Sequence, residues 1–323
     1  TNTPTPTPTD TRTATPTPTP TNTPTPTPVV PCQWTGTVST DWMTTGNWTN
    51  CGGGVPGVTN SVMIPNVTNK PVLGADTTVA NLTLQSGTIV TVNSGWTLTV
   101  NGSLTVITAS LSGAGAVNSN GTTQFNGSVT IGATVTLYDL EILGNGNLNL
   151  SRDLTVTHAL TINDLNQVTG NFDLVALGSV TSNDTSYTHQ FGTSAIKLAG
   201  AGNQTVSGTG KIYSLEAANG GNVLIPSNLT LLPGGILTGS RLITGGVLNI
   251  GDGLTAGNYS VTFSGSVDAV DIKLDNSWSL ALGADLTINN SLTLSSLAQV
   301  TGNFDLVALG SVTSNDTSYT HQF

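Results

Sequence analysis

Two groups of acidic residues have spacings that could support acid–base or cation chemistry. Each group lies near a basic residue in the sequence: Asp139 and Glu141 near Arg152, and Asp268, Asp271 and Asp275 near Lys273. Side chains two residues apart in a strand point to the same face, so Asp139 and Glu141 would stand side by side. Such a pair suits a general acid and base, or oxygen ligands for Ca²⁺. The reaction class it would serve is that of a polysaccharide lyase or hydrolase.

An internal repeat argues against this chemistry. At an offset of 132 residues, the repeat has Lys273 where the first copy has Glu141. A change from acid to base is expected at an ordinary exposed position and not at a catalytic one. The three histidines, His158, His189 and His321, are isolated, and the last two are copies of one another. The sequence contains no Ser/His/Asp order, metal-ligand spacing or phosphate-binding loop. We therefore predict that the protein is not an enzyme and uses no cofactor or metal.

The repeat has a variable part and an unchanged part. The 25 residues QVTGNFDLVALGSVTSNDTSYTHQF occupy both Gln167 to Phe191 and Gln299 to Phe323. Before them only nine of 30 aligned residues are identical, yet the apolar positions are kept: Leu140/Ile272, Ile142/Leu274, Leu148/Leu280, Leu150/Leu282, Leu154/Leu286, Val156/Ile288, Leu160/Leu292, Ile162/Leu294 and Leu165/Leu297. Burial explains the kept apolar rows. The unchanged part indicates a recent duplication, with a repeated contact surface as the alternative, and predicts a segment like Gly192–Gly200 after Phe323.

Short strands must carry these apolar rows. Pairs of apolar residues flank single polar residues, with Gly, Asn and Ser between pairs: Leu82/Leu84, Val90/Val92, Leu98/Val100, Leu104/Val106, Val129/Ile131, Val135/Leu137, Leu140/Ile142, Leu148/Leu150, Leu154/Val156 and Leu160/Ile162. Both members of a pair point to one face. Strands so short fit stacked coils around one continuous core better than a sandwich. We predict an all-β fold, a β-solenoid of the right-handed parallel β-helix type. With coils of about 22 residues, the repeat would span six of them.

Composition narrows the possible partners. Charged residues make up 7% of the chain, against roughly 25% in an ordinary soluble domain. The net charge of −10 comes from scattered residues, so no basic stripe is present to bind nucleic acid. No apolar run of about 18 residues is present, so no membrane-spanning helix is expected. The chain begins without Met or a signal peptide, which suggests a processed product or a fragment.

Residues 1–28 form a separate segment in which Thr occupies every odd position and Pro occupies most of the even ones. Proline fixes the backbone and removes hydrogen-bond donors, so we predict polyproline II structure here. The composition suits an O-glycosylated stalk, with a plain linker as the alternative. Candidate O-glycosylation sites are Thr3, Thr5, Thr7, Thr17, Thr19 and Thr25. N-linked sequons are numerous, for example at Asn47, Asn81, Asn101, Asn126 and Asn228, and would matter only in a glycosylating host.

Residues 29–73 have the character of a cap, and residues 74–323 form the solenoid. Cys32 and Cys51 would close a loop of about 20 residues as a disulfide in an oxidising compartment, and their spacing does not suit zinc. Trp34, Trp42 and Trp48 lie within 15 residues. Clustered tryptophans can cover the open end of a stack of coils, which is the interpretation we favour. The alternative is a platform on which glycans stack.

The order W-x-G-x(4)-D-W-x(4)-N-W, followed by G-x-x-P and by L-T-L and L-T-V strands, resembles secreted bacterial β-solenoid surface proteins, broadly filamentous-haemagglutinin-like adhesins and extracellular fibre proteins. The resemblance implies an extracellular or cell-surface location and an adhesive or structural role. We therefore expect a structural subunit of an extracellular filament, sheath or surface appendage, assembling end to end with copies of itself. The alternative is a cell-surface adhesin that binds glycans.

Overall fold

The computed structural model describes residues 30–185, 194–212, 214–217, 221–232, 236–237, 242–245, 247–250, 260–263, 267–274, 279–294 and 299–315. The chain divides into two compact units between Val30 and Pro31. The predicted polyproline II segment and its candidate O-glycosylation sites lie outside the described residues. The second unit is nearly all β, with one short 3₁₀ helix, η1 (Thr45–Asn47), in its described part.

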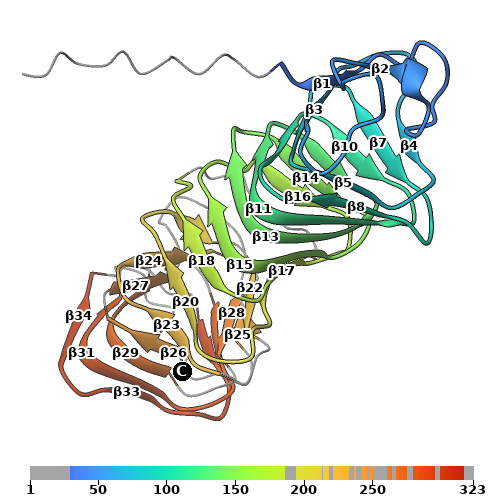
Figure 1. Ribbon diagram of the computed structural model, residues 1–323. Coiled ribbons are helices and arrows are strands. Elements are labelled where there is room, and N and C mark those ends of the chain that lie inside the picture. The colour runs from blue at the N-terminus through green and yellow to red at the C-terminus, as the bar shows by residue number, and fades with distance from the viewer. Residues whose placement is uncertain are drawn as a thin grey trace, which may run out of the picture. The chain divides into compact units, whose positions relative to one another are not determined.

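The second unit is a stack of coils, and each coil has three faces (Figure 1). On every face, a strand pairs in parallel with strands of the coils before and after it, as predicted for a β-solenoid. Among the described strands the one antiparallel pair is β1 (Cys32–Trp34) with β2 (Trp48–Thr49), in the predicted cap. The all-β solenoid with parallel stacking is confirmed, and its handedness stays a prediction.

Three strands are long enough to turn a corner and serve the first face with their N-terminal half and the second face with their C-terminal half: β11 (Ala116–Asn126), β13 (Thr134–Leu143) and β15 (Leu154–Ile162). The first face also contains β5 (Thr77–Val79), β8 (Thr97–Val100), β17 (Leu174–Ala176), β19 (Ile196–Leu198), β22 (Leu215–Ala217), β25 (Ile236–Leu237), β28 (Ser260–Phe263), β30 (Ser279–Leu282) and β32 (Gln299–Thr301).

Two further strands turn the corner from the second face to the third: β29 (Val267–Leu274) and β31 (Leu286–Leu294). The second face begins at β1 and also contains β3 (Ser61–Ile64), β6 (Asn81–Leu84), β9 (Leu104–Ile107), β18 (Ser179–Ser182), β20 (Gln204–Ser207), β23 (Val223–Ile225), β26 (Leu242–Thr244) and β33 (Leu306–Ala308).

The third face has two described runs of strands. The first run contains β4 (Val72–Leu73), β7 (Ile89–Val92), β10 (Ser110–Ser112), β12 (Val129–Ile131), β14 (Asn147–Leu150) and β16 (Gln167–Thr169). The second contains β21 (Lys211–Ile212), β24 (Leu229–Leu231), β27 (Val247–Ile250) and β34 (Ser311–Ser314), together with the C-terminal halves of β29 and β31.

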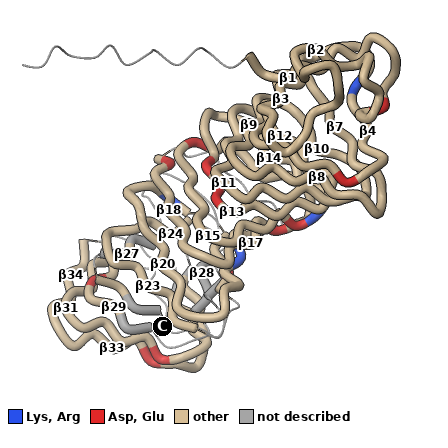
Figure 2. The backbone as a smooth tube through the Cα atoms, in the orientation of Figure 1, with Lys and Arg blue, Asp and Glu red and all other residues tan. Residues whose placement is uncertain are grey.

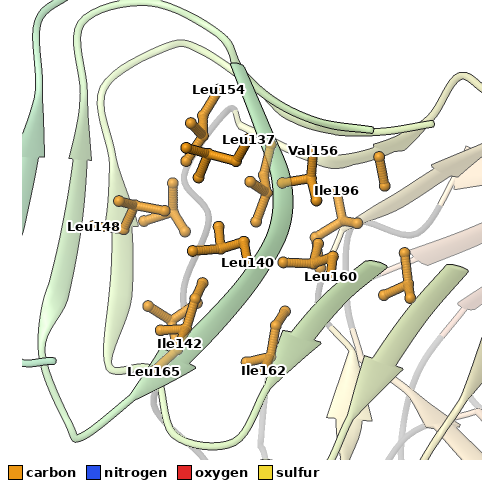
Figure 3. Close-up of a cluster of buried hydrophobic side chains, with 14 of the residues drawn as sticks. Leu137, Leu140, Ile142, Leu148, Leu154, Val156, Leu160, Ile162, Leu165 and Ile196 are labelled. Atoms are coloured by element: carbon orange, nitrogen blue, oxygen red, sulfur yellow. The ribbon is translucent and has the colours of Figure 1, made fainter. Parts of the chain in front are cut away.

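The core is a column of apolar side chains inside the coils. All ten apolar pairs predicted from the sequence are buried, and the polar residue between the two members of each pair is more exposed. Figure 3 shows the arrangement in the coils around β15, where side chains from three faces meet: Leu137, Leu140, Ile142, Leu148, Leu154, Val156, Leu160, Ile162 and Leu165. Because successive side chains of a strand alternate, period two in the sequence is enough to place these residues inside.

The sequence repeat and the coils differ in length. Six parallel pairing steps along the first face lead from β15 to β30, through Thr155, Val175, Lys197, Glu216, Ile236, Thr262 and Ala281. The repeat, however, places the copy of Thr155 at Thr287, six residues further on and on the second face. The repeat is therefore longer than the expected six coils, by one face of a coil. Each repeat of 132 residues advances the chain by six coils and one additional face.

In the described part of the chain, no helix has the length and apolar character needed to cross a membrane.

Candidate functional sites

The predicted acid pair lies on β13. Asp139 and Glu141 pair with Ala159 and Thr161 of the next coil, and their side chains point outward as expected. The Asp139 Oδ1 atom lies 2.7 Å from Nδ1 of His158, a residue on β15 that is 60% exposed. The His158 ring also stacks on Tyr138, with ring centroids 4.6 Å apart. The carboxylate of Asp139 is thus part of a contact between adjacent coils.

Glu141 makes a similar contact with two coils. One carboxylate oxygen accepts a hydrogen bond from Gln124 of β11 at 3.0 Å, and the other accepts one from Asn163 at 2.9 Å. Gln124 belongs to the preceding coil and Asn163 to the following one. The Glu141 carboxylate therefore links its own coil to the coils before and after it, which is a structural role.

The second acidic group shows the same arrangement with different partners. Asp271 of β29 accepts a hydrogen bond from Asn290 at 2.8 Å and another from the Ser291 hydroxyl. Asp271 and Asn290 are the repeat copies of Asp139 and His158. The carboxylate is kept while its partner changes from imidazole to amide, so the position serves the contact between coils. Asp268 lies on β29 as well, and Asp275 lies outside the described residues.

The charged residues are spread over many coils (Figure 2). Lys197 links two neighbouring coils, with its Nζ atom 3.9 Å from Asp173 and 3.7 Å from Glu216. Within the described ranges, no group of three or more His, Cys, Asp or Glu side chains could hold a metal ion.

The cap contains the predicted disulfide, Cys32–Cys51, with Cα atoms 4.7 Å apart. Beside it the three indole rings pack on one another: the ring centroid of Trp48 lies 4.9 Å from that of Trp34 and 4.7 Å from that of Trp42. The Trp48 N–H donates to the Trp42 carbonyl at 2.7 Å, and the Trp34 N–H donates to the Asn69 carbonyl at 2.8 Å. The rings therefore form a buried group that is continuous with the core of the coils.

That buried group leaves no ring face for a sugar. Trp34 and Trp42 are 0% exposed and Trp48 is 7% exposed. The predicted glycan contact at these three residues thus has no support in the structure, because a sugar needs an accessible ring face to stack on. Aromatic residues of the described coils that do reach solvent are Trp96, Tyr138, Phe172 and Phe304.

Asn47 is a structural centre of the cap that sequence reasoning missed. It is fully buried. Its side-chain oxygen accepts hydrogen bonds from the backbone N–H groups of Val38 and Ser39, both at 2.9 Å. Its amide nitrogen donates to the Asp41 carbonyl at 2.8 Å and to the Ser39 hydroxyl at 3.1 Å. Asn47 heads an N-W-T sequon, but a side chain so engaged is not accessible for glycosylation. The D-W-x(4)-N-W spacing was the signal available.

The last described coil contains apolar side chains that are more exposed than their repeat copies. We call the surface formed by Phe304, Leu306, Ala308 and Val312 the end face. Val312 of β34 is 58% exposed, whereas its identical counterpart Val180 of β18 is 0% exposed. Leu306, Ala308 and Val312 also line an open hollow together with Val300 of the same coil and with Leu292 and Leu294 of the coil beneath. Leu306, Ala308 and Val312 therefore have buried repeat copies in the same molecule, whereas the copy of Phe304, Phe172, is exposed as well.

Comparison with known proteins gives one match. Residues 33–122 match the model of a domain family of unknown function, DUF8693, so the match covers the cap and the first coils. No curated protein and no solved structure matches the chain. The family description assigns no activity, so the functional argument depends on the geometry described above.

Proposed function

We propose that this chain is a structural subunit of an extracellular filament, sheath or surface appendage. The observation that carries the proposal is the unbroken apolar column within the described coils, bounded at one end by the cap. Stacked coils contact only their neighbours, so such a chain extends in one direction and adds length coil by coil. The carboxylates of Asp139, Glu141 and Asp271 contribute contacts between coils.

An extracellular location is supported by the cap. A disulfide such as Cys32–Cys51 forms and persists in oxidising compartments and is rare in the cytosol. The Thr/Pro composition of residues 1–28 is also that of stalks outside the cell. Together these features favour a secreted or surface-attached protein.

Assembly with copies of itself would use the ends of the stack. A contact between the cap of one copy and the end face of another is heterologous, and a heterologous contact that does not close produces a filament.

The experiment compares the full chain with a chain that lacks residues 1–31. Light scattering at rising protein concentration and negative-stain electron microscopy should show elongated assemblies in both. Immunogold labelling of the producing cells should place the protein on fibres, a sheath or appendages at the cell surface. Monodisperse monomers at high concentration, together with label inside the cell, would refute the proposal.

A glycan-binding adhesin is the second candidate, and one observation favours it. Tyr138 is 44% exposed, and its ring stacks on His158, which in turn contacts the Asp139 carboxylate. Sugars can use an exposed ring with hydrogen-bonding groups nearby. A glycan array tests it with wild type and Tyr138→Ala. Binding that is lost in the variant supports the adhesin, whereas the absence of binding in both removes this candidate.

A further inference from the structure

The first face carries a column of polar side chains in the coils near the cap. Strands β5 and β8 and the N-terminal halves of β11, β13 and β15 pair in parallel, so one outward position of each strand continues that of the strand before it. We call these residues the polar column: Thr78, Thr99, Asn118, Thr136 and Thr155. All of them are partly exposed. Because paired strands lie about 4.8 Å apart, the polar column is about 19 Å long.

The side chains of the polar column make no hydrogen bond to any described residue of the protein. The outward columns of the other two faces differ in these coils. On the third face, Asn149 links Thr130 to Thr169. On the second face, Gln124 donates to Glu141 at 3.0 Å. The first face therefore keeps donors and acceptors available for a ligand where the other faces use theirs between coils.

The polar column is also uncharged. The strand segments that carry it contain no Lys, Arg, Asp, Glu or His: residues 77–79, 97–100, 116–119, 134–137 and 154–157. Beyond Thr155 the same outward row continues as Val175, Lys197 and Glu216, so the neutral stretch ends there. A charged ligand would find no opposite charge along the polar column, which favours a neutral one.

Two carboxylates stand at the corner where the third face turns into the first, and both are occupied. Asp76 accepts the Thr97 N–H at 2.8 Å, and Asp153 accepts the Asp173 N–H at 2.9 Å. Each bond joins two successive coils at the corner. These carboxylates therefore hold the border of the face in place.

Exposed aromatic residues border the polar column on both sides. Trp96 directly precedes β8, at the corner with the third face, and is 40% exposed. Tyr138 follows Thr136 along β13, toward the second face, and is 44% exposed. Two pairing steps separate their coils, which is about 10 Å along the stack. Trp and Tyr combine an apolar ring with a polar group, which suits sugars, because a sugar ring has apolar C–H faces and hydroxyl edges.

We infer that the polar column, together with Trp96 and Tyr138, is a binding surface for a neutral, unbranched polysaccharide that lies along the stack of coils. A Thr hydroxyl both donates and accepts hydrogen bonds, as sugar hydroxyls do. The β-branched Thr side chains are stiff, so little conformational freedom is lost on binding. A repeating polymer meets several coils at once, so that weak single contacts act together. The inference rests on the adhesin candidate, to which it gives a surface and a ligand class, and it is independent of filament formation.

The test measures co-sedimentation of the full chain with insoluble cellulose, mannan and starch, and with a pectate gel as the charged counterpart. One variant, Thr99→Val with Thr136→Val, removes two hydroxyls of the polar column at nearly constant shape. A second variant is Trp96→Ala. The matched control, Thr83→Val with Thr105→Val, removes two outward hydroxyls of paired strands on the second face. Circular dichroism checks that every variant is folded.

We expect the wild type and the matched control to bind at least one neutral polysaccharide equally well. Both first-face variants should bind it about tenfold more weakly, because they lose hydrogen bonds or a stacking ring. Stronger binding to pectate than to every neutral polysaccharide overturns the inference. Equal binding by the wild type and the first-face variants also overturns it and leaves the adhesin candidate with a different surface. A wild type that binds none of these polysaccharides overturns the inference as well, whereas binding on the glycan array would still support the adhesin candidate.

Discussion

Leu154 and Leu286 occupy equivalent positions of the 132-residue repeat, and both are fully buried, yet they lie on different faces of the solenoid. Leu154 pairs with Leu174 on the first face, and Leu286 pairs with Val267 on the second. The core accepts the same side chain on either face because every face contributes the same kind of apolar row. The repeat therefore preserves the row of apolar side chains but not the face of the solenoid on which that row lies.

The buried register predicts a sharp contrast between adjacent residues. Leu154→Asp places an uncompensated charge in the core and should destabilise the surrounding coils by about 4 kcal/mol. Thr155→Asp changes a residue between the inward positions and should cost less than about 1 kcal/mol. Thermal unfolding followed by circular dichroism measures both. Equal tolerance of Asp at the two positions would disprove the register.

Reduction of the Cys32–Cys51 disulfide should loosen the cap before the coils unfold. The bond closes a loop with a sequence separation of 19, and such a loop is worth about 3 kcal/mol. Because solenoid coils depend mainly on their neighbours, the loss should stay local at first. Tryptophan fluorescence during thermal unfolding, with and without reductant, reports on Trp34, Trp42 and Trp48 once Trp96 and Trp278 are replaced by Phe. Two free thiols in the mass spectrum of the native protein would contradict the prediction.

Asn47→Ala should destabilise the cap by about 3 kcal/mol, since it removes four hydrogen bonds of a buried side chain and leaves the Val38 and Ser39 N–H groups unpaired. Asn145→Ala, at an exposed position, serves as the control and should change stability by less than about 0.5 kcal/mol. Limited proteolysis of residues 32–73 provides the measurement. A protease-resistant cap in Asn47→Ala would show that the hydrogen bonds are dispensable.

Gly178 should not accept even a methyl group. A Cβ at this position would lie 1.7 Å from the carbonyl oxygen of His158, and a Cβ at its repeat copy, Gly310, would lie 1.8 Å from that of Asn290. Gly178→Ala must therefore push two coils apart, at a cost of about 1–3 kcal/mol. Gly54→Ala, with no atom within 4 Å of the new Cβ, should have little effect. Chemical denaturation of both variants tests the close approach of the coils.

Strands and burial could be predicted from the sequence because alternation is a local property. The pairs Leu82/Leu84 and Leu98/Val100, for example, needed only their own spacing to place them inside. Two predicted short strands, at Leu154/Val156 and Leu160/Ile162, are the ends of one strand, because the polar residues between them continue the extended backbone around a corner. That corner depends on neighbouring coils, which local spacing does not report.

The candidate sites were harder to predict because their partners lie a whole coil away. Asp139 meets His158 at a separation of 19 residues, and Glu141 meets Gln124 and Asn163 at separations of 17 and 22. Coil lengths vary with the turns, so sequence spacing alone could not pair these residues. The burial of the three tryptophans of the cap was hard to predict for the same reason. The Trp34 N–H, for example, donates to the Asn69 carbonyl at a separation of 35 residues.

The additional face in each repeat makes the duplication a screw operation rather than a translation. A partner that recognised the outward residues of the copied 25-residue segment would have to approach the two copies from different sides of the stack. In an array of repeats with this spacing, the segment would return to its starting side only at every third repeat, because a coil has three faces. Such a chain would display one motif along a spiral path, which favours contacts distributed around the stack over binding on a single flank.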